Sequence, residues 1–123
     1  MSKIFAIAVP ILPGKTETWK QWMEELKGKY RSDFEASRRQ LGVHERTFLQ
    51  QTPMGDLVLV TLEGENPQEA FIKFGQGEDE FTKWFMEGVK EVHGIDLTQP
   101  PPAEAPMPEL IMDSKPEQVA EYN

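Results

Sequence analysis

Few residues in this sequence could perform acid–base or metal chemistry. The 123 residues include two histidines, His44 and His93, and no cysteine. The absence of cysteine excludes disulfides, thiolate zinc sites, iron–sulfur clusters and cysteine nucleophiles. Neither histidine belongs to an H-x-x-x-H motif or has a paired-carboxylate spacing, and no serine sits in an elbow-like motif. The sequence therefore predicts no metal and no cofactor, and it leaves open whether the protein is an enzyme.

Aromatic side chains and one nearby arginine are the other candidates for function. A set this rich in rings is explained most simply as a core, but ligand pockets are also lined by rings. Tryptophan and arginine each have a polar end that needs a partner or water. We therefore expect a pocket for a flat apolar ligand between helices and sheet. The expected ligand-binding residues are Trp22, His44, Arg46, Phe48 and Trp84.

The register of one hairpin decides which of these side chains can face such a pocket. Residues 52–56 carry a tight-turn signal, with proline second and glycine fourth. If a type I turn is closed by that glycine, Arg46 and Phe48 share the helix-facing side with Val58. Arg46 and His44 then lie at the pocket rim. A slip of one residue reverses this assignment.

Two short stretches, residues 4–9 and 57–62, are apolar at almost every position and rich in β-forming residues. Successive strand residues point to opposite faces, so both faces of these strands are apolar. Helices in a small α+β domain usually cover one face. A second copy of the chain is the simplest cover for the other, and we expect a homodimer joined there.

Apolar residues at a helical period extend from about residue 16 to Leu41, ahead of Gly42. Such a helix would be about 40 Å long at ~1.5 Å per residue, whereas an eight-residue strand spans about 26 Å. We therefore expect a bend or break near Gly28.

A second helical region starts after Asn66 and is interrupted at residues 75–77. The two glycines there do not form a phosphate loop, because acidic residues follow where a phosphate would bind.

The element order is β-α-β-β-α-β, with a polar second strand at 45–52 and a last strand at 110–112. The predicted fold class is α+β, ferredoxin-like, with an antiparallel sheet in the order 4-1-3-2. The polar second strand suits an edge, where charge discourages further pairing. We expect a single domain, with a core at 1–97, a proline-rich linker at 98–108, and the last strand and a polar tail at 109–123.

Three segments carry a resemblance to a known family. They are the strand at 4–9, Leu12-Pro13-Gly14-Lys15 before the Trp19/Trp22 helix, and the strand at 56–63 followed by Asn66-Pro67-Gln68-Glu69-Ala70-Phe71. On these features the chain resembles the dimeric α+β barrel superfamily, which includes antibiotic-biosynthesis monooxygenases, haem-degrading monooxygenases and stress-responsive barrel proteins. The resemblance covers roughly residues 3–95 and implies a ligand lodged between helices and sheet.

The resemblance also implies activities with recognisable residue requirements. Cofactor-free monooxygenases of this group use asparagine, tryptophan and histidine or arginine around an aromatic substrate. Here the asparagines are Asn66, expected to cap a helix, and Asn123, the last residue. A haem protein would need His44 or His93 as its axial ligand.

We therefore expect a small barrel protein that binds a small apolar or aromatic molecule. The alternatives are a cofactor-independent monooxygenase or isomerase acting on an aromatic or polyketide-like substrate, and a haem-binding or haem-degrading protein. The net charge of −8 argues against nucleic acid and anionic membrane surfaces as partners. No stretch approaches the roughly 20 apolar residues of a membrane span, and without cysteine we expect a cytoplasmic location.

Overall fold

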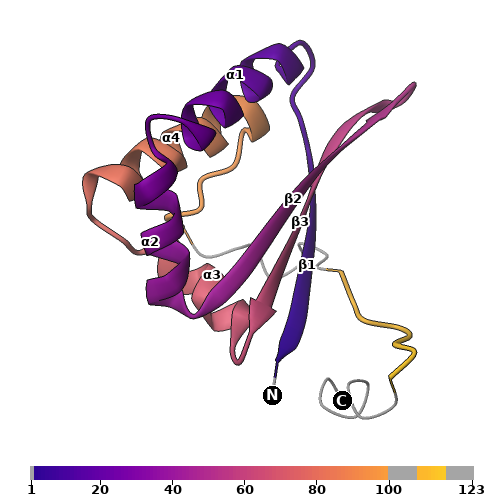
Figure 1. The fold of residues 1–123 in the computed structure, drawn as a ribbon. Helices are drawn as coiled ribbons and strands as arrows, with labels where there is room; N and C mark the ends of the chain where they lie inside the picture. The colour runs from indigo at the N-terminus through magenta and orange to yellow at the C-terminus, as the bar shows by residue number, and fades with distance from the viewer. Residues whose placement is uncertain (1, 100–107, 116–123) are drawn as a thin grey trace.

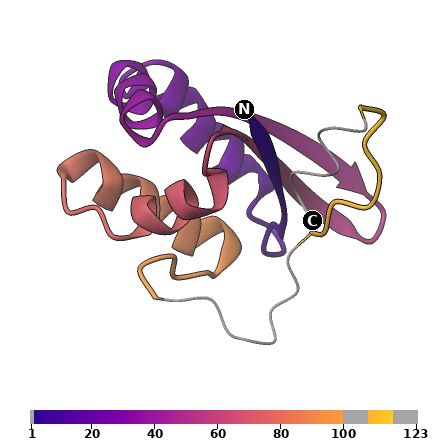
Figure 2. The same cartoon turned by 90° about the horizontal axis from the view of Figure 1, so that it is seen from below.

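The computed structural model describes residues 2–99 and 108–115. In this part of the chain, helices lie on one face of an antiparallel sheet (Figures 1 and 2). The strands are β1 (Lys3–Pro10), β2 (Val43–Thr52) and β3 (Gly55–Gly64). The helices are α1 (Thr16–Lys27), α2 (Arg31–Leu41), α3 (Pro67–Gly75) and α4 (Glu80–His93). The α+β class with an antiparallel sheet is confirmed.

The described strands are in the order β1-β3-β2, which agrees with the 1-3-2 part of the expected order. Residues 110–112 form no strand, so the expected last strand is wrong at these residues. A run of three apolar residues offers few ladder hydrogen bonds to offset the entropy of ordering the chain. Residues 108–114 instead line a groove with Lys3–Ala6 of β1 and the start of α3. Most of the expected linker, and the tail beyond 115, fall outside the described residues.

The long helical stripe is broken where expected. Helix α1 ends at Lys27, Gly28 follows as its C-cap, and α2 begins at Arg31. Figure 1 shows α2 turning away from the axis of α1. Gly42 ends α2 in the left-handed conformation, at a φ of 72°, as a glycine cap predicts. The break lets both helices follow the sheet, which one straight helix of that length could not do.

The second helical region is also divided, between Gly75 and Glu80. Asp79 caps α4 because its Oδ2 accepts a hydrogen bond of 3.1 Å from the Thr82 amide. Asn66, expected to cap α3, makes no side-chain cap hydrogen bond. Helix α4 thus begins at Glu80, directly after its cap.

Two clusters of buried apolar side chains form the core. The first joins the sheet to α1 and α4, and the second lies among the helices. Trp22 of α1 belongs to the first cluster, and its indole lies against Gly88 of α4. The first cluster contains Ile11, Trp19, Trp22, Val58, Val89 and Val92, and the second contains Leu26, Phe74, Phe81 and Met86.

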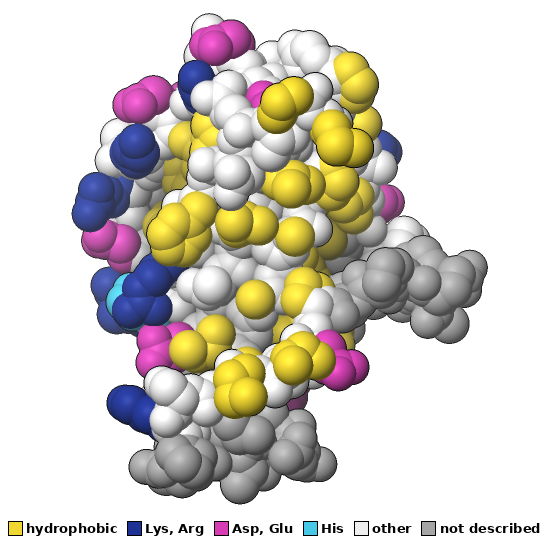
Figure 3. Space-filling view, turned by 90° about the vertical axis from the view of Figure 1, so that its right-hand side faces the viewer, with side chains coloured by type: hydrophobic (Ala, Val, Ile, Leu, Met, Phe, Trp, Pro, Cys, Tyr) yellow, Lys and Arg dark blue, Asp and Glu magenta, His cyan; other side chains and the backbone are white. Residues whose placement is uncertain are grey.

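The sheet face opposite the helices carries exposed apolar side chains, which Figure 3 shows as a band across the strands. Along β1, burial alternates strictly, and the outward side chains are exposed. Ile4 is 49% exposed on this face, and Phe48 of β2 is 52% exposed. The prediction that β1 and β3 are apolar on both sides therefore holds for the described strands. Among the described helices, none has the length and apolar character needed to cross a membrane.

Candidate functional site: a cavity between helices and sheet

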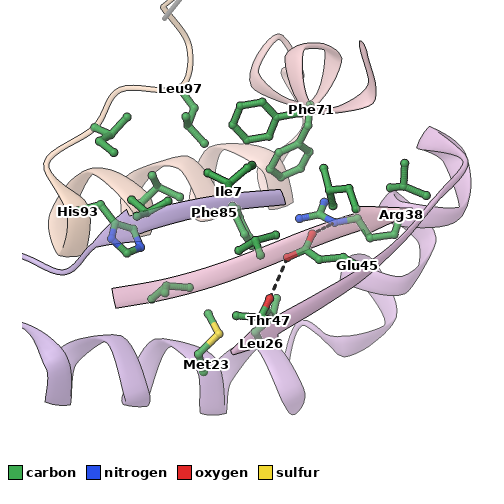
Figure 4. A pocket seen from close by; sticks show the side chains of 18 of the residues that line it. Ile7, Met23, Leu26, Arg38, Glu45, Thr47, Phe71, Phe85, His93 and Leu97 are labelled. Carbon is green, nitrogen blue, oxygen red and sulfur yellow. Dashed lines mark hydrogen bonds and ion pairs between the residues drawn. The ribbon is translucent and has the colours of Figure 1, made fainter. Parts of the chain in front are cut away.

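A cavity of about 110 Å³ lies between the helix layer and the sheet (Figure 4). All three strands and all four described helices contribute to its wall, which is mainly aliphatic and aromatic. For comparison, an engineered apolar cavity of about 150 Å³ in another protein takes up benzene. The space is thus on the scale of a single ring. The polar side chains that reach its wall include Arg38, Glu45, Thr47 and His93.

Strand pairing places two of these polar side chains. Glu45 pairs with Leu62, and Thr47 pairs with Val60. Directly paired residues of antiparallel strands share a face, so Glu45 and Thr47 point toward the helices with these buried or half-buried residues. The alternation of side chains along β2 therefore places the Glu45 carboxylate in the mainly apolar layer between sheet and helices.

Arg38 of α2 meets this carboxylate. Its Nε donates to Glu45 Oε1 at 2.7 Å, and its Nη1 donates to Ser37 Oγ at 3.0 Å. The second carboxylate oxygen, Oε2, accepts from Thr47 Oγ1 at 3.2 Å. Arg38 is 8% exposed, so the cation is almost wholly removed from solvent. Figure 4 shows the pair at one end of the cavity.

Aromatic rings surround the guanidinium. Its central carbon lies 4.2 Å from the ring centre of Phe74, 4.7 Å from that of Phe34 and 5.2 Å from that of Phe85. A cation over aromatic faces gains electrostatic energy that is largest where water is excluded. The rings and the carboxylate together offset the cost of burying the charge.

His93 lies toward the other end of the cavity in Figure 4. Its Nδ1 is 2.8 Å from the Pro10 carbonyl oxygen. A carbonyl only accepts, so Nδ1 carries the proton and Nε2 is left as an acceptor in the neutral ring. Burial lowers the pKa of His93, against the opposing effect of the Pro10 hydrogen bond. Desolvation is the larger of the two effects, so burial favours the neutral form of the ring.

Three of the expected site residues lie on the opposite face of the sheet. Thr52 pairs directly with Gly55, so no extra residue is inserted and the register differs by one from the expected turn. His44, Arg46 and Phe48 consequently face away from the helices. Arg46 instead donates from Nη1 to Glu63 Oε1 at 3.1 Å on the exposed face. The expectation that these side chains look into the helix–sheet pocket is therefore wrong.

The two expected tryptophans have different surroundings. Trp22 lines the cavity, and its Nε1 is the fully buried side-chain polar atom that lacks a hydrogen-bond partner within the described residues. Trp84 does not line the cavity. It stacks on Tyr30, with ring centres 4.0 Å apart. The structure thus brings Trp22, but not Trp84, together with the polar residues of the cavity wall.

Apart from His93, the polar residues of the cavity wall were not among those singled out from the sequence, although one signal pointed to Arg38 and Glu45. Arg38 interrupts the apolar stripe of α2, between Phe34 and Leu41 at helical spacing. A charged residue on an apolar stripe calls for a buried partner of opposite charge, and Glu45 follows soon after in β2.

No group of three or more histidine, aspartate or glutamate side chains that could hold a metal ion occurs within residues 2–99 and 108–115. No protein-family model matches the sequence, and comparison with curated proteins and with solved structures finds no match either. The candidate site therefore rests on its geometry.

Proposed function

We propose that the protein binds a small apolar molecule in the cavity between its helices and its sheet. The observation that carries this proposal is the cavity itself, about 110 Å³ of unfilled space with an apolar wall and a few polar side chains. Ligand sites have this composition, in which apolar walls supply affinity and a few polar groups fix orientation. The volume favours a compact ligand, close to one ring in size.

The test uses a ring compound and a pair of matched variants. Val60 faces the cavity, whereas Leu59, its neighbour in β3, faces away from the helices. Phenylalanine at 60 would fill the space, and phenylalanine at 59 would leave it open. We expect toluene to bind the wild type and Leu59→Phe, and to lose affinity for Val60→Phe, in titrations followed by methyl NMR.

Circular dichroism and thermal melting would show whether each variant is folded, since filling a core can cost about 1–3 kcal/mol. Absence of toluene binding to the wild type would refute the proposal. Equal binding to a folded Val60→Phe variant would place the ligand elsewhere.

A second candidate function is cofactor-independent catalysis on the bound ring, as an oxygenase or isomerase. His93 favours it, because a neutral imidazole beside the cavity is suited to removing a proton from a ligand. Oxygen uptake with a hydroquinone, lost in His93→Asn, would support it. A haem does not fit this site, since a porphyrin is much larger than the cavity.

We also propose that the chain forms a homodimer through the helix-free face of its sheet, in the manner of the dimeric α+β barrels. The support is the exposed apolar band on that face, which includes Ile4 and Phe48. Patches of this kind mark association surfaces. The negative charge of the chain argues against nucleic acid or an anionic membrane as the partner.

A further inference from the structure

We infer that the ligand is a neutral ring compound bearing a carbonyl or hydroxyl oxygen, and that the Arg38–Glu45 pair recognises this oxygen. The inference rests on the proposed function and adds the chemical class of the ligand. It follows from the hydrogen bonds that the pair makes, from its net charge and from its place in the cavity wall.

The hydrogen bonds that Arg38 makes within the described residues use only some of its N–H donors. A guanidinium has five N–H groups. Nε is bonded to Glu45 and Nη1 to Ser37, and Nη2 has no hydrogen-bond partner among the described residues. Since Arg38 lines the cavity and is 8% exposed, a ligand there is the natural partner for this donor.

The charge of the pair selects a neutral ligand. Arg38 and Glu45 neutralise each other, and both line the same cavity. A ligand carboxylate would be attracted by the guanidinium but repelled by the Glu45 carboxylate beside it, and it would also lose its hydration in an apolar space. A ligand cation would be attracted by the Glu45 carboxylate but repelled by the Arg38 guanidinium, which already lies over aromatic rings. Neither charge gains a clear partner.

An uncharged oxygen fits this arrangement. A carbonyl can accept from Nη2, and a hydroxyl can accept from Nη2 while donating to the remaining lone pairs of Glu45. Hydrogen bonds to charged groups are stronger than those between neutral groups. The same low-polarity surroundings that favour a ring in the cavity strengthen this contact.

The experiment compares probes of nearly equal size. These are toluene, benzaldehyde, benzyl alcohol, benzoate and benzylammonium, titrated into the wild-type protein near neutral pH. We expect benzaldehyde and benzyl alcohol to bind about tenfold more tightly than toluene, the gain of roughly one hydrogen bond to a charged group. Benzoate and benzylammonium should bind more weakly than toluene.

Matched double variants separate this site from the other arginine–glutamate pair. Arg38→Met with Glu45→Met replaces the buried pair without leaving a lone charge, and such replacements usually fold. Arg46→Met with Glu63→Met removes the exposed pair on the opposite face. The first variant should still bind toluene but lose its preference for benzaldehyde. The second should keep the preference.

The outcomes distinguish the two proposals. If no probe binds the wild type, both fail. If toluene binds but benzaldehyde and benzyl alcohol gain nothing, or benzoate binds most tightly, the cavity is a ligand site and the inferred ligand class is wrong. A benzaldehyde preference that persists in the folded Arg38/Glu45 variant would also overturn the inference.

Discussion

Trp22 of α1 and Gly88 of α4 are in direct contact, and the contact leaves no room for a β-carbon at position 88. A methyl group there would overlap Nε1, Cε2 and Cζ2 of the indole. Gly88 therefore sets how closely α1 and α4 approach each other. It also leaves space for the Trp22 indole, which forms part of the cavity wall.

Gly88→Ala should destabilise the protein by about 1–3 kcal/mol, because overpacking outweighs the roughly 1 kcal/mol by which alanine is usually favoured over glycine in helices. Urea unfolding would measure the change, and tryptophan fluorescence would report the displaced indole. The control is Gly28→Ala, where the added carbon meets only ordinary van der Waals contact. Stabilisation by Gly88→Ala would show that the helices can separate without cost.

The two arginine–glutamate pairs should differ in their importance for folding. Arg38→Met leaves Glu45 buried without its partner, and we expect a loss of about 3–5 kcal/mol. Arg46→Met breaks a pair at the exposed face and should cost at most about 1 kcal/mol. Chemical denaturation of both variants at one pH makes the comparison. Similar small losses would mean that water reaches Glu45 once the guanidinium is gone.

The stability of the protein should fall as the pH is lowered through the range in which free histidine titrates. The folded state lowers the pKa of His93, so the unfolded chain binds the proton more readily than the folded chain does. The contribution is fully present above about pH 6.5 and is lost as the pH falls toward the pKa of the folded state.

His93→Asn should flatten this part of the profile, since the amide can still donate to the Pro10 carbonyl but does not titrate. Free energies of unfolding at about pH 7.5 and about pH 5.5 would make the test. An unchanged slope in the variant would assign the pH dependence to other groups.

The proposed dimer predicts a selective effect of charge on the helix-free face. The wild type should sediment as a dimer at micromolar concentration, and Ile4→Glu with Phe48→Glu should produce a folded monomer. Ile72→Glu on α3 is the control, because Ile72 is 50% exposed but belongs to a helix. A monomeric wild type, or dissociation by Ile72→Glu alone, would contradict this interface.

The helix breaks and the order of the helices and the first three strands were predictable from local signals. Gly28 directly follows α1, and Gly75 and Gly77 stand at the division between α3 and α4, as expected for a residue that disfavours a helix interior. The apolar runs of β1 and β3 mark strands buried on at least one face. The hairpin register was not predictable in this way. It depends on whether Gly55 pairs with Thr52 or is an extra, unpaired residue of the turn. A register shift of one residue exchanges the sheet faces on which Arg46 and Glu45 lie.

The polar part of the candidate site was missed for a related reason. Arg38 and Glu45 are close in sequence, but the sequence alone does not show that both side chains turn inward. That orientation follows from the β2–β3 register and from the way α2 packs after the break at Gly28. Residues 110–112 were expected to be a strand because they are apolar, and apolar character alone does not supply a pairing partner.

The cavity also affects how the protein responds to hydrostatic pressure. About 110 Å³ within the folded chain is not filled by protein atoms, and this space disappears when unfolding exposes the cavity wall to water. Unfolding therefore reduces the volume of the system, by an amount that for small proteins is about 20–100 mL/mol. Pressure should then favour the unfolded state, and a molecule that fills the cavity should make the folded state less compressible and more resistant to pressure.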